Sequence, residues 1–498
     1  MTVKRNIVAN LSGSAWAALM SIAFVPLYIK FMGVESFGII GVYTALVGIL
    51  AILDLGLSQT MNREMARLSS MQGQEQLLAD TARTLEVVYW FIAIVVMSLI
   101  YLLSDFIVFY WLNPEQLSRE SLQQAFWIMA LVIGLRWPIA IYTGGLNGLQ
   151  RQVKVNMVLA IFTTLQGIGA LVVLWLIEPT IQAFFLWQAF IALLHVIVLR
   201  ITLWRSLSHD NKGKFCKQVL HNVWRFAAGM TGISLLATIL TQLDKVLLSR
   251  MLSLADFGYY TFAATVAMVV FRIVGPVFTA YYPRLTELVA KKDQPELIKS
   301  FHQGSQLMAV AILPLTLILA FFSKEVLDVW THNPEIVAHS SWLISLLIIG
   351  NAINGIVHIP YALQLGHGWT KLAFYQNTIA VILLVPAIYF ATLRWGAVGA
   401  ASVWIVLNCG YFFISVQVMF RRLIPEEKWR WYVDDVGKIL LAVMLVTCIA
   451  RAFAVDDFKD LTKILILVFT FGTASALAAV SANKLAWQFP FLPRNETR

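Results

Sequence analysis

The chain carries little charge and little cysteine, and each shortage excludes a class of protein. Only 13% of its 498 residues are charged, about half of the roughly 25% that soluble domains carry. Three scattered cysteines, with no CxxC pair, predict neither a disulfide framework nor a zinc site. Because 59% of the residues are apolar, an intrinsically disordered chain and an ordinary cytosolic enzyme are excluded as well. The composition is that of a polytopic membrane protein.

Long polar connectors are also missing. Apolar blocks follow one another along the chain, each near the ~20 residues that cross a bilayer, and no connector between them is longer than about 20 residues. We count fourteen blocks, so the sequence predicts an all-α membrane protein of about 14 transmembrane helices. No connector is long enough for a soluble catalytic domain. The work of the protein is therefore expected inside the membrane, without enzyme activity, cofactor or metal ion.

Lysine and arginine are distributed unevenly between alternate connectors. With the N-terminus in the cytoplasm, the cytoplasmic connectors carry roughly three times as many of them as the outer connectors, which is the positive-inside bias. Both termini are therefore predicted to be cytoplasmic. The net charge of +10 reflects this topology, and no nucleic-acid partner is expected, because the cations punctuate apolar segments. The first span follows Lys4 and Arg5 and lacks a cleavage site, so no cleavable signal peptide is expected.

The two halves of the chain share a weak internal repeat. A shift of about 220 residues aligns Phe37 with Phe257 and Gly38 with Gly258, each pair opening a span after a short turn. The repeating unit is six spans, an even number, so both copies enter the membrane from the same side. Parallel repeats related by an axis along the membrane normal are typical of transporters, with the substrate site between them.

The repeat predicts how the chain is divided. Two six-helix lobes, related by a pseudo-two-fold along the membrane normal, are expected to surround a central cavity. The N-terminal lobe is predicted at residues 1–205, a basic cytoplasmic linker at 206–223 and the C-terminal lobe at 224–421. Residues 422–498 would add two further spans and a cytoplasmic tail.

Four short motifs resemble the polysaccharide flippase family. They are NLSGSAW at Asn10–Trp16, PLY at Pro26–Tyr28, GVESFG at Gly33–Gly38 and GGLNG at Gly144–Gly148. This family contains the translocases of O-antigen and exopolysaccharide repeat units. It belongs to the MOP superfamily, which also holds the MATE exporters and the lipid II flippase. The resemblance covers roughly residues 1–422.

The resemblance implies a substrate and a mechanism. The family moves an undecaprenyl-diphosphate-linked oligosaccharide from the cytoplasmic to the periplasmic leaflet of the bacterial inner membrane. Two lobes would rock around the central cavity, driven by a gradient of a coupling cation, H⁺ or Na⁺. A polysaccharide polymerase and export proteins would be its protein partners, and the lipid bilayer its surroundings.

Arg272 is the first predicted substrate-binding residue. Along its helix it lies about 22 Å from Phe257 and about 18 Å from Arg284, near mid-depth of the bilayer. A guanidinium there costs at least ~2.5–3.5 kcal/mol unless water, an anion or a carboxylate compensates it. Either Arg272 lines a water-filled cavity and grips the diphosphate with its planar fork, or it bonds backbone carbonyls freed near Pro276.

Arg136 and Lys245 are expected to assist Arg272 in substrate binding. Arg136 is similarly central, although Pro138 frees carbonyl groups that would give it a purely structural partner. Lys245 lies about 8 Å from the outer end of its span, where its long side chain could instead reach the interface. Among the deep ionisable residues the cations outnumber the anions, which suits a diphosphate.

Asp54, Asp244 and His358 are the predicted residues for ion coupling or charge balance. Asp54 would neutralise an arginine of the cavity, bind a cation, or satisfy a helix break at Gly56. Asp244 adjoins Lys245, but neighbours on a helix point about 100° apart, so each is expected to need another partner. His358 would relay protons, or be a buried histidine that donates one hydrogen bond.

Two acidic pairs are expected to be solvated. Asp434-Asp435 and Asp456-Asp457 fall in predicted connectors without further metal-ligating residues.

Two other kinds of function compete with the flippase. A MATE-like exporter of cationic drugs would share the fold, but acidic residues would dominate its cavity; a lipid II flippase would differ in substrate alone. A membrane enzyme of polysaccharide assembly would need a sizeable outer loop with catalytic groups. The charges and the short connectors favour the polysaccharide flippase over both.

Overall fold

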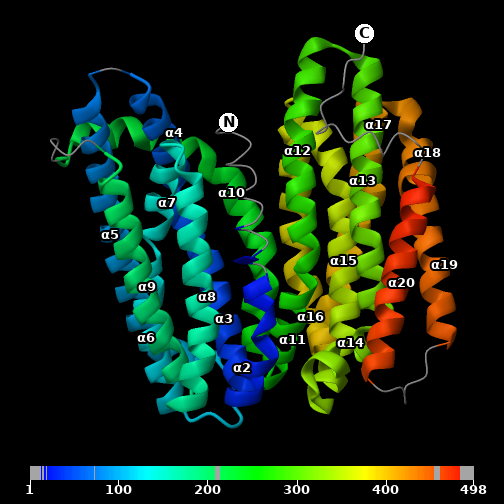
Figure 1. Cartoon of the computed structure of the whole chain (residues 1–498), viewed down its shortest axis with the longest axis horizontal. Coiled ribbons are helices and arrows are strands. Elements are labelled where there is room, and N and C mark those ends of the chain that lie inside the picture. The colour runs from blue at the N-terminus through cyan, green and yellow to red at the C-terminus, as the bar shows by residue number, and fades with distance from the viewer. Residues whose placement is uncertain are drawn as a thin grey trace. The chain divides into compact units, whose positions relative to one another are not determined.

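All elements of the computed structural model are helices in the part of the chain that it describes (Figure 1). That part comprises residues 13, 16–17, 19–71, 73–207, 213–453 and 460–482, with the backbone alone for 222–237. Eleven of its helices are long and apolar enough to cross a membrane. The predicted all-α, polytopic membrane fold is confirmed, whereas the count of fourteen spans stays a prediction.

The chain divides into two compact units, Met1–Thr261 and Phe262–Arg498. The elements of the first unit are α2 (Val25–Met32), α3 (Val34–Leu50), η1 (Ala51–Asp54), α4 (Leu57–Ser69), α5 (Glu75–Phe106), η2 (Ile107–Trp111), α6 (Arg119–Arg136), α7 (Ile139–Gly148), α8 (Gln152–Leu176), α9 (Ile181–Trp204) and α10 (Lys217–Met251). The helix α11 (Leu254–Ala267) begins in this unit, and α10 packs on α3, α4 and α5. The division into lobes at the 206–223 linker stays a prediction.

The second unit holds the rest of the helices. They are α12 (Val269–Lys291), α13 (Gln294–Phe321), α14 (Ser323–Thr331), α15 (Pro334–Gly366), α16 (Thr370–Gly410), η3 (Tyr411–Ser415), α17 (Val416–Leu423), η4 (Pro425–Glu427), α18 (Lys428–Arg430), η5 (Trp431–Gly437), α19 (Lys438–Phe453) and α20 (Asp460–Ser481). The helix α15 packs against α12, α13 and α16, so it forms the centre of this bundle.

Capping residues mark where several spans begin. The side chains of Ser118, Thr180 and Asn333 accept hydrogen bonds from backbone N–H groups in the first turns of α6, α9 and α15. These N–H groups have no partner inside the helix, and a bilayer offers none, so the caps fix the start of each span.

Two interruptions bend the apolar segments. Pro138 has no N–H group to donate, and the segment Arg119–Gly148 is divided there into α6 and α7. Gly396 has φ +57°, a left-handed conformation that interrupts the helical stretch Thr370–Leu423. That stretch would extend for about 80 Å as one rod, far beyond the ~30 Å of a hydrocarbon core, so it folds as two spans.

The repeat is visible as a reciprocal contact within the first unit. A Cβ atom on Gly38 would lie closer than 3.0 Å to the carbonyl oxygen of Leu254, and one on Gly258 equally close to the carbonyl oxygen of Val34. Both glycines are the fifth residue of their helices, α3 and α11. Contacts in which residue i meets j and residue j meets i are what a two-fold relation requires. The reciprocal contact of the aligned Gly38 and Gly258 agrees with the two-fold relation predicted from the repeat.

Ion pairs join the last two helices, α19 and α20, to α14 of the same unit. Arg451 of α19 bonds the nearly buried carboxylate of Glu325, and Lys463 of α20 lies 2.5 Å from Asp328. Both acidic partners belong to α14, and α19 and α20 also pack along α13.

Candidate functional site

Asp54 lies at a break in the helical backbone. It ends η1, and Leu55 and Gly56 follow with φ values of 50° and 74°. Its two carboxylate oxygens accept hydrogen bonds from the hydroxyl groups of Tyr89 and of Ser58, the latter at 2.9 Å. Of the three expected uses, this geometry corresponds to a carboxylate held at the helix break.

Arg136 is held by neutral groups. Its Nη1 donates to the Tyr43 hydroxyl at 2.7 Å, and its Nη2 donates to Oε1 of Gln166 at 3.1 Å. It has no carboxylate partner in the described part of its unit. No described carboxylate of this unit therefore offsets the positive charge of the guanidinium, which lies at the end of α6, just before the Pro138 kink.

Asp244 and Lys245 pair with each other. The Lys245 ammonium lies 3.4 Å from one carboxylate oxygen of Asp244 and donates to the Thr241 carbonyl at 2.9 Å. The Tyr260 hydroxyl donates to the other carboxylate oxygen at 2.7 Å. Each residue has the further partner that the sequence predicted, Tyr260 for Asp244 and the Thr241 carbonyl for Lys245, and the two neighbours also form a long ion pair.

Arg272 lies on an exposed face of α12. Within the described residues of the second unit it has neither a hydrogen-bond nor an ion-pair partner. The exposed residues that follow it up to Glu287 are small, polar or proline, namely Gly275, Pro276, Thr279, Ala280, Pro283, Arg284 and Glu287, whereas Met268, one turn before it, is apolar and 53% exposed. Faces of other spans that are exposed carry large apolar side chains, such as Phe91 and Leu102 on α5, 67% and 74% exposed. The α12 face has the composition of a surface in contact with water.

His358 is next to that helix, on α15. Its Nδ1 donates to the backbone carbonyl of Asn354 at 2.9 Å. The ring lies against Phe271 and Phe278 of α12, with centroids 6.1 Å and 5.9 Å away. This arrangement corresponds to the expected alternative of a histidine that donates one hydrogen bond.

The six predicted residues are thus only partly brought together. Asp244 and Lys245 are in direct contact; Asp54 and Arg136 belong to the same unit but have other partners. Arg272 and His358 are on adjacent helices of the second unit.

The expectation that Asp435 is solvated is wrong. Its side chain is 0% exposed and accepts hydrogen bonds from His302 and, at 2.8 Å, from Gln306. The second ring nitrogen of His302 lies 2.8 Å from Glu427. The signal that we overlooked is helical spacing, since Asp435 shares a face with buried neighbours four residues apart, which are Trp431, Ile439 and Val443. Its neighbour Asp434 is partly exposed and pairs with Lys438; Asp456 and Asp457 lie outside the described residues.

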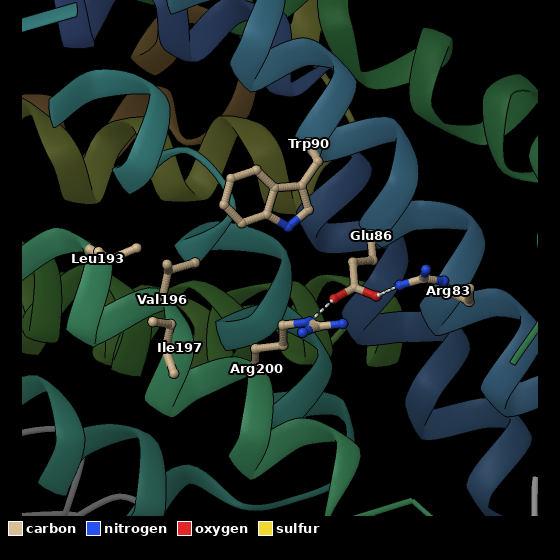
Figure 2. Close-up of a pocket in the computed structure, with 7 residues that line it drawn as sticks. All are labelled: Arg83, Glu86, Trp90, Leu193, Val196, Ile197 and Arg200. Carbon is tan, nitrogen blue, oxygen red and sulfur yellow. Dashed lines mark hydrogen bonds and ion pairs between the residues drawn. The ribbon is translucent and has the colours of Figure 1, made fainter. Parts of the chain in front are cut away.

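A second polar cluster was also overlooked. Glu86 of α5 is 3% exposed, and its carboxylate accepts from Arg200 Nε at 2.6 Å, Arg83 Nη1 at 2.7 Å and the Tyr142 hydroxyl at 2.7 Å. The Trp204 indole adds a longer bond of 3.4 Å. The two guanidiniums reach the carboxylate from α5 and from α9 (Figure 2).

A pocket of about 190 Å³ adjoins this cluster. Besides the three charged residues, it is lined by Trp90, Leu193, Val196 and Ile197 (Figure 2). Glu86 also shares a helical face with buried apolar residues, namely Ala82, Tyr89 and Ala93, and that spacing could have identified it.

Comparisons with known proteins agree with the fold. A family model described as “Polysaccharide biosynthesis protein” matches residues 3–289, and one described as MatE matches residues 230–390. A “Putative O-antigen transporter” of Shigella flexneri is 24% identical over 406 residues, which cover 81% of this chain and 94% of that protein.

Two solved structures share the architecture. The lipid II flippase MurJ in an inward closed conformation is 14% identical with a TM-score of 0.69, covering 95% of this chain and 98% of its own. An inward-facing MATE family multidrug transporter is 12% identical with a TM-score of 0.65, covering 83% of this chain and 96% of its own. At these identities they show the fold alone.

The helical fold, the repeat and the match to more than half of the chain lead to one assignment. The chain belongs to the polysaccharide biosynthesis protein family, as a multi-pass membrane protein with the fold of MurJ and of MATE transporters.

Proposed function

We propose that this transporter moves undecaprenyl-diphosphate-linked oligosaccharide repeat units from the cytoplasmic to the periplasmic leaflet by alternating access. The family assignment supports a lipid-linked polysaccharide as substrate. The observation that carries the finer proposal is Arg272, an exposed arginine without an acidic partner on the small and polar face of α12.

The position of Arg272 supports contact with the substrate. It lies in the middle of the 38-residue helical span Leu254–Lys291, so its guanidinium cannot easily reach either interface. In lipid at that depth it would cost at least ~2.5–3.5 kcal/mol. Water and a diphosphate remove that cost, and the planar fork donates two parallel hydrogen bonds to phosphate oxygens.

Arg136 and Lys245 are the proposed assistants. Among the described residues of its unit, Arg136 is bonded by neutral groups, so its charge is available to an anion. Lys245 is partly neutralised by Asp244, so it would contribute less. The direction of this charge balance favours an anionic substrate over the cations of a drug exporter.

A coupling cation, H⁺ or Na⁺, completes the proposed cycle. Asp54 is the first proposed site, because helix breaks in transporters free backbone carbonyls that coordinate such ions beside a carboxylate. Asp244 and His358 are proposed to balance charge as the cycle proceeds.

The setting is proposed from the cation distribution and the family. The protein would lie in the bacterial inner membrane with both termini in the cytoplasm, and would act with a polysaccharide polymerase and export proteins. The protein itself would catalyse no covalent step and need no cofactor.

Deletion and complementation in the native host test the proposal. We expect the deletion strain to accumulate lipid-linked repeat units that face the cytoplasm, and the wild-type gene to restore export. Arg272→Ala should lose roughly tenfold or more of transport, and Arg272→Lys should lose less, because it keeps the charge but not the two-pronged contact.

The matched control is Arg394→Ala. Arg394 is an exposed arginine on α16 whose guanidinium lies over the Trp395 ring. It should support wild-type export. Full export by Arg272→Ala at equal expression would exclude the substrate contact, and loss of cationic-drug resistance without any change in lipid-linked intermediates would identify an exporter instead.

A further inference from the structure

A pocket lies between α5 and α9, beside the buried Glu86. The helix α6 packs against both α5 and α9, but after Pro138 the chain continues as α7, which packs mainly on α4. Tyr142 of α7 still borders the groove between α5 and α9, because its hydroxyl donates to Glu86 and accepts from the Trp90 indole. All residues that line the pocket belong to α5 and α9 (Figure 2). Its volume of about 190 Å³ is far more than the ~30 Å³ of a water molecule.

The polar end of the pocket carries a net positive charge. Glu86 is buried and shared by two arginines, so the three charges sum to one unit of positive charge. The Arg83 and Arg200 side chains are 41% and 51% exposed. Each donates through one nitrogen to the carboxylate, so further N–H groups of both guanidiniums face outward. Two half-exposed guanidiniums held by one carboxylate form a fork for an anion.

The other end of the pocket is apolar and continuous with the exposed surface of α9. Leu193 and Ile197 line the pocket, and both are exposed, each at 41%. Phe190 and Ile201 extend the same apolar surface along the helix. A ligand that fits both ends is amphiphilic, with an anionic head and an apolar chain.

The level of the pocket matches that of lipid head groups. Arg200 is four residues, about 6 Å, from the end of α9, and Arg83 is eight residues, about 12 Å, from the start of α5. The segment Glu75–Trp111 has 37 residues and exceeds the ~30 Å hydrocarbon core, so its first turns extend into the head-group region. The cation distribution assigns this end to the cytoplasm, where anionic lipids give the leaflet its negative surface potential.

We propose that this pocket binds the phosphate group of an anionic glycerophospholipid of the cytoplasmic leaflet, with an acyl chain along Leu193 and Ile197. The site is independent of the proposed transport path, because it uses none of the residues assigned to the substrate or to the coupling ion.

Native mass spectrometry of the full-length protein in detergent tests the site. The protein is titrated with phosphatidylglycerol and, separately, with phosphatidylcholine of the same acyl chains. We expect the wild-type protein to prefer phosphatidylglycerol by roughly tenfold, the effect of one charge-assisted hydrogen-bonding group.

The variants are chosen to avoid an unpaired buried carboxylate. In the triple variant Arg83→Gln, Glu86→Gln, Arg200→Gln no charge remains in the pocket, and the lipid preference should disappear. Arg200→Lys keeps the charge without the planar fork and should retain part of the preference. The control Arg205→Gln removes an exposed arginine directly after α9 and should keep the wild-type preference.

Four outcomes would overturn the proposal. In the first, the triple variant unfolds at the wild-type temperature yet keeps the lipid preference. In the second, Arg205→Gln loses as much of the preference as the triple variant does. In the third and fourth, the bound lipid is displaced by inorganic phosphate at millimolar concentration, or by undecaprenyl phosphate far below the phosphatidylglycerol concentration. The third would indicate a soluble anion as ligand and the fourth a substrate site.

Discussion

The crossing of α3 and α11 at Gly38 and Gly258 leads to a quantitative prediction. Replacing either glycine with alanine places a Cβ atom closer than 3.0 Å to a backbone carbonyl oxygen of the opposite helix, that of Leu254 or Val34. A backbone atom cannot rotate away as a side chain can, so the helices must separate by several tenths of an ångström. Overpacking of this kind costs about 1–3 kcal/mol.

The alanine variants also gain helix propensity, so the control must share that gain. Gly472 of α20 and Gly410 of α16 have open space at the Cβ position and no left-handed backbone. Alanine at either should therefore be neutral, or stabilising by about 0.5–1 kcal/mol. The difference between Gly38→Ala and Gly472→Ala isolates the steric contribution, and we expect it to be about 1–3 kcal/mol.

The two glycine substitutions should not be additive. Both carbonyl contacts belong to one crossing, so a separation of α3 and α11 caused by Gly38→Ala also relieves the contact at Gly258. The double variant should lose less stability than the sum of the single variants, by about 0.5–3 kcal/mol, as residues that share a contact do.

Unfolding in mixed micelles with increasing SDS, followed by the fluorescence of the 17 tryptophans, measures these differences. Two results would refute the reasoning. Gly38→Ala could match Gly472→Ala in its unfolding midpoint, which would mean that the helices separate freely. Alternatively, strict additivity of the two substitutions would mean that the contacts are independent.

The remaining predictions concern a buried cluster and the topology. His302→Ala leaves the fully buried Asp435 without its histidine partner and should destabilise the protein by about 3–5 kcal/mol in the same unfolding assay. The control His367→Ala removes an exposed histidine and should change stability little. Equal losses of stability in the two variants would contradict the reasoning. A cysteine in place of Glu115 should react with a membrane-impermeant maleimide added to intact spheroplasts, and one in place of Lys214 should not; labelling of both from outside would contradict the predicted topology.

Some individual residues were predictable only in part. The depth of Arg272 and Arg136 follows from counting along apolar blocks, and both lie well inside their spans. Their partners do not follow from that count, because Tyr43 and Gln166 come from α3 and α8, far from Arg136 in the chain. The need of Asp244 and Lys245 for further partners followed from helix geometry, but the identity of Tyr260, sixteen residues from Asp244, did not.

Acidic residues near the ends of spans were the main failure of sequence reasoning. Asp435 is predicted to be solvated because it falls in a predicted connector, and Glu86 is not singled out by the sequence. Both are buried, and in each case the partners are in helices that are distant in the sequence, with His302 on α13 and Arg200 on α9. The four-residue spacing of buried neighbours on the same face was the available signal.

The sequence was sufficient to predict an all-α, multi-pass membrane protein and the internal repeat, whereas the number of spans stays a prediction. Bilayers impose on every spanning segment an apolar length and internal backbone hydrogen bonding, and these are local properties that composition and spacing record. Tertiary structure alone decided which charges are paired across helices, that a pocket lies between α5 and α9, and that Gly38 and Gly258 meet across one crossing. Those features depend on distances between helices that no local pattern encodes, because packing brings together residues more than a hundred positions apart.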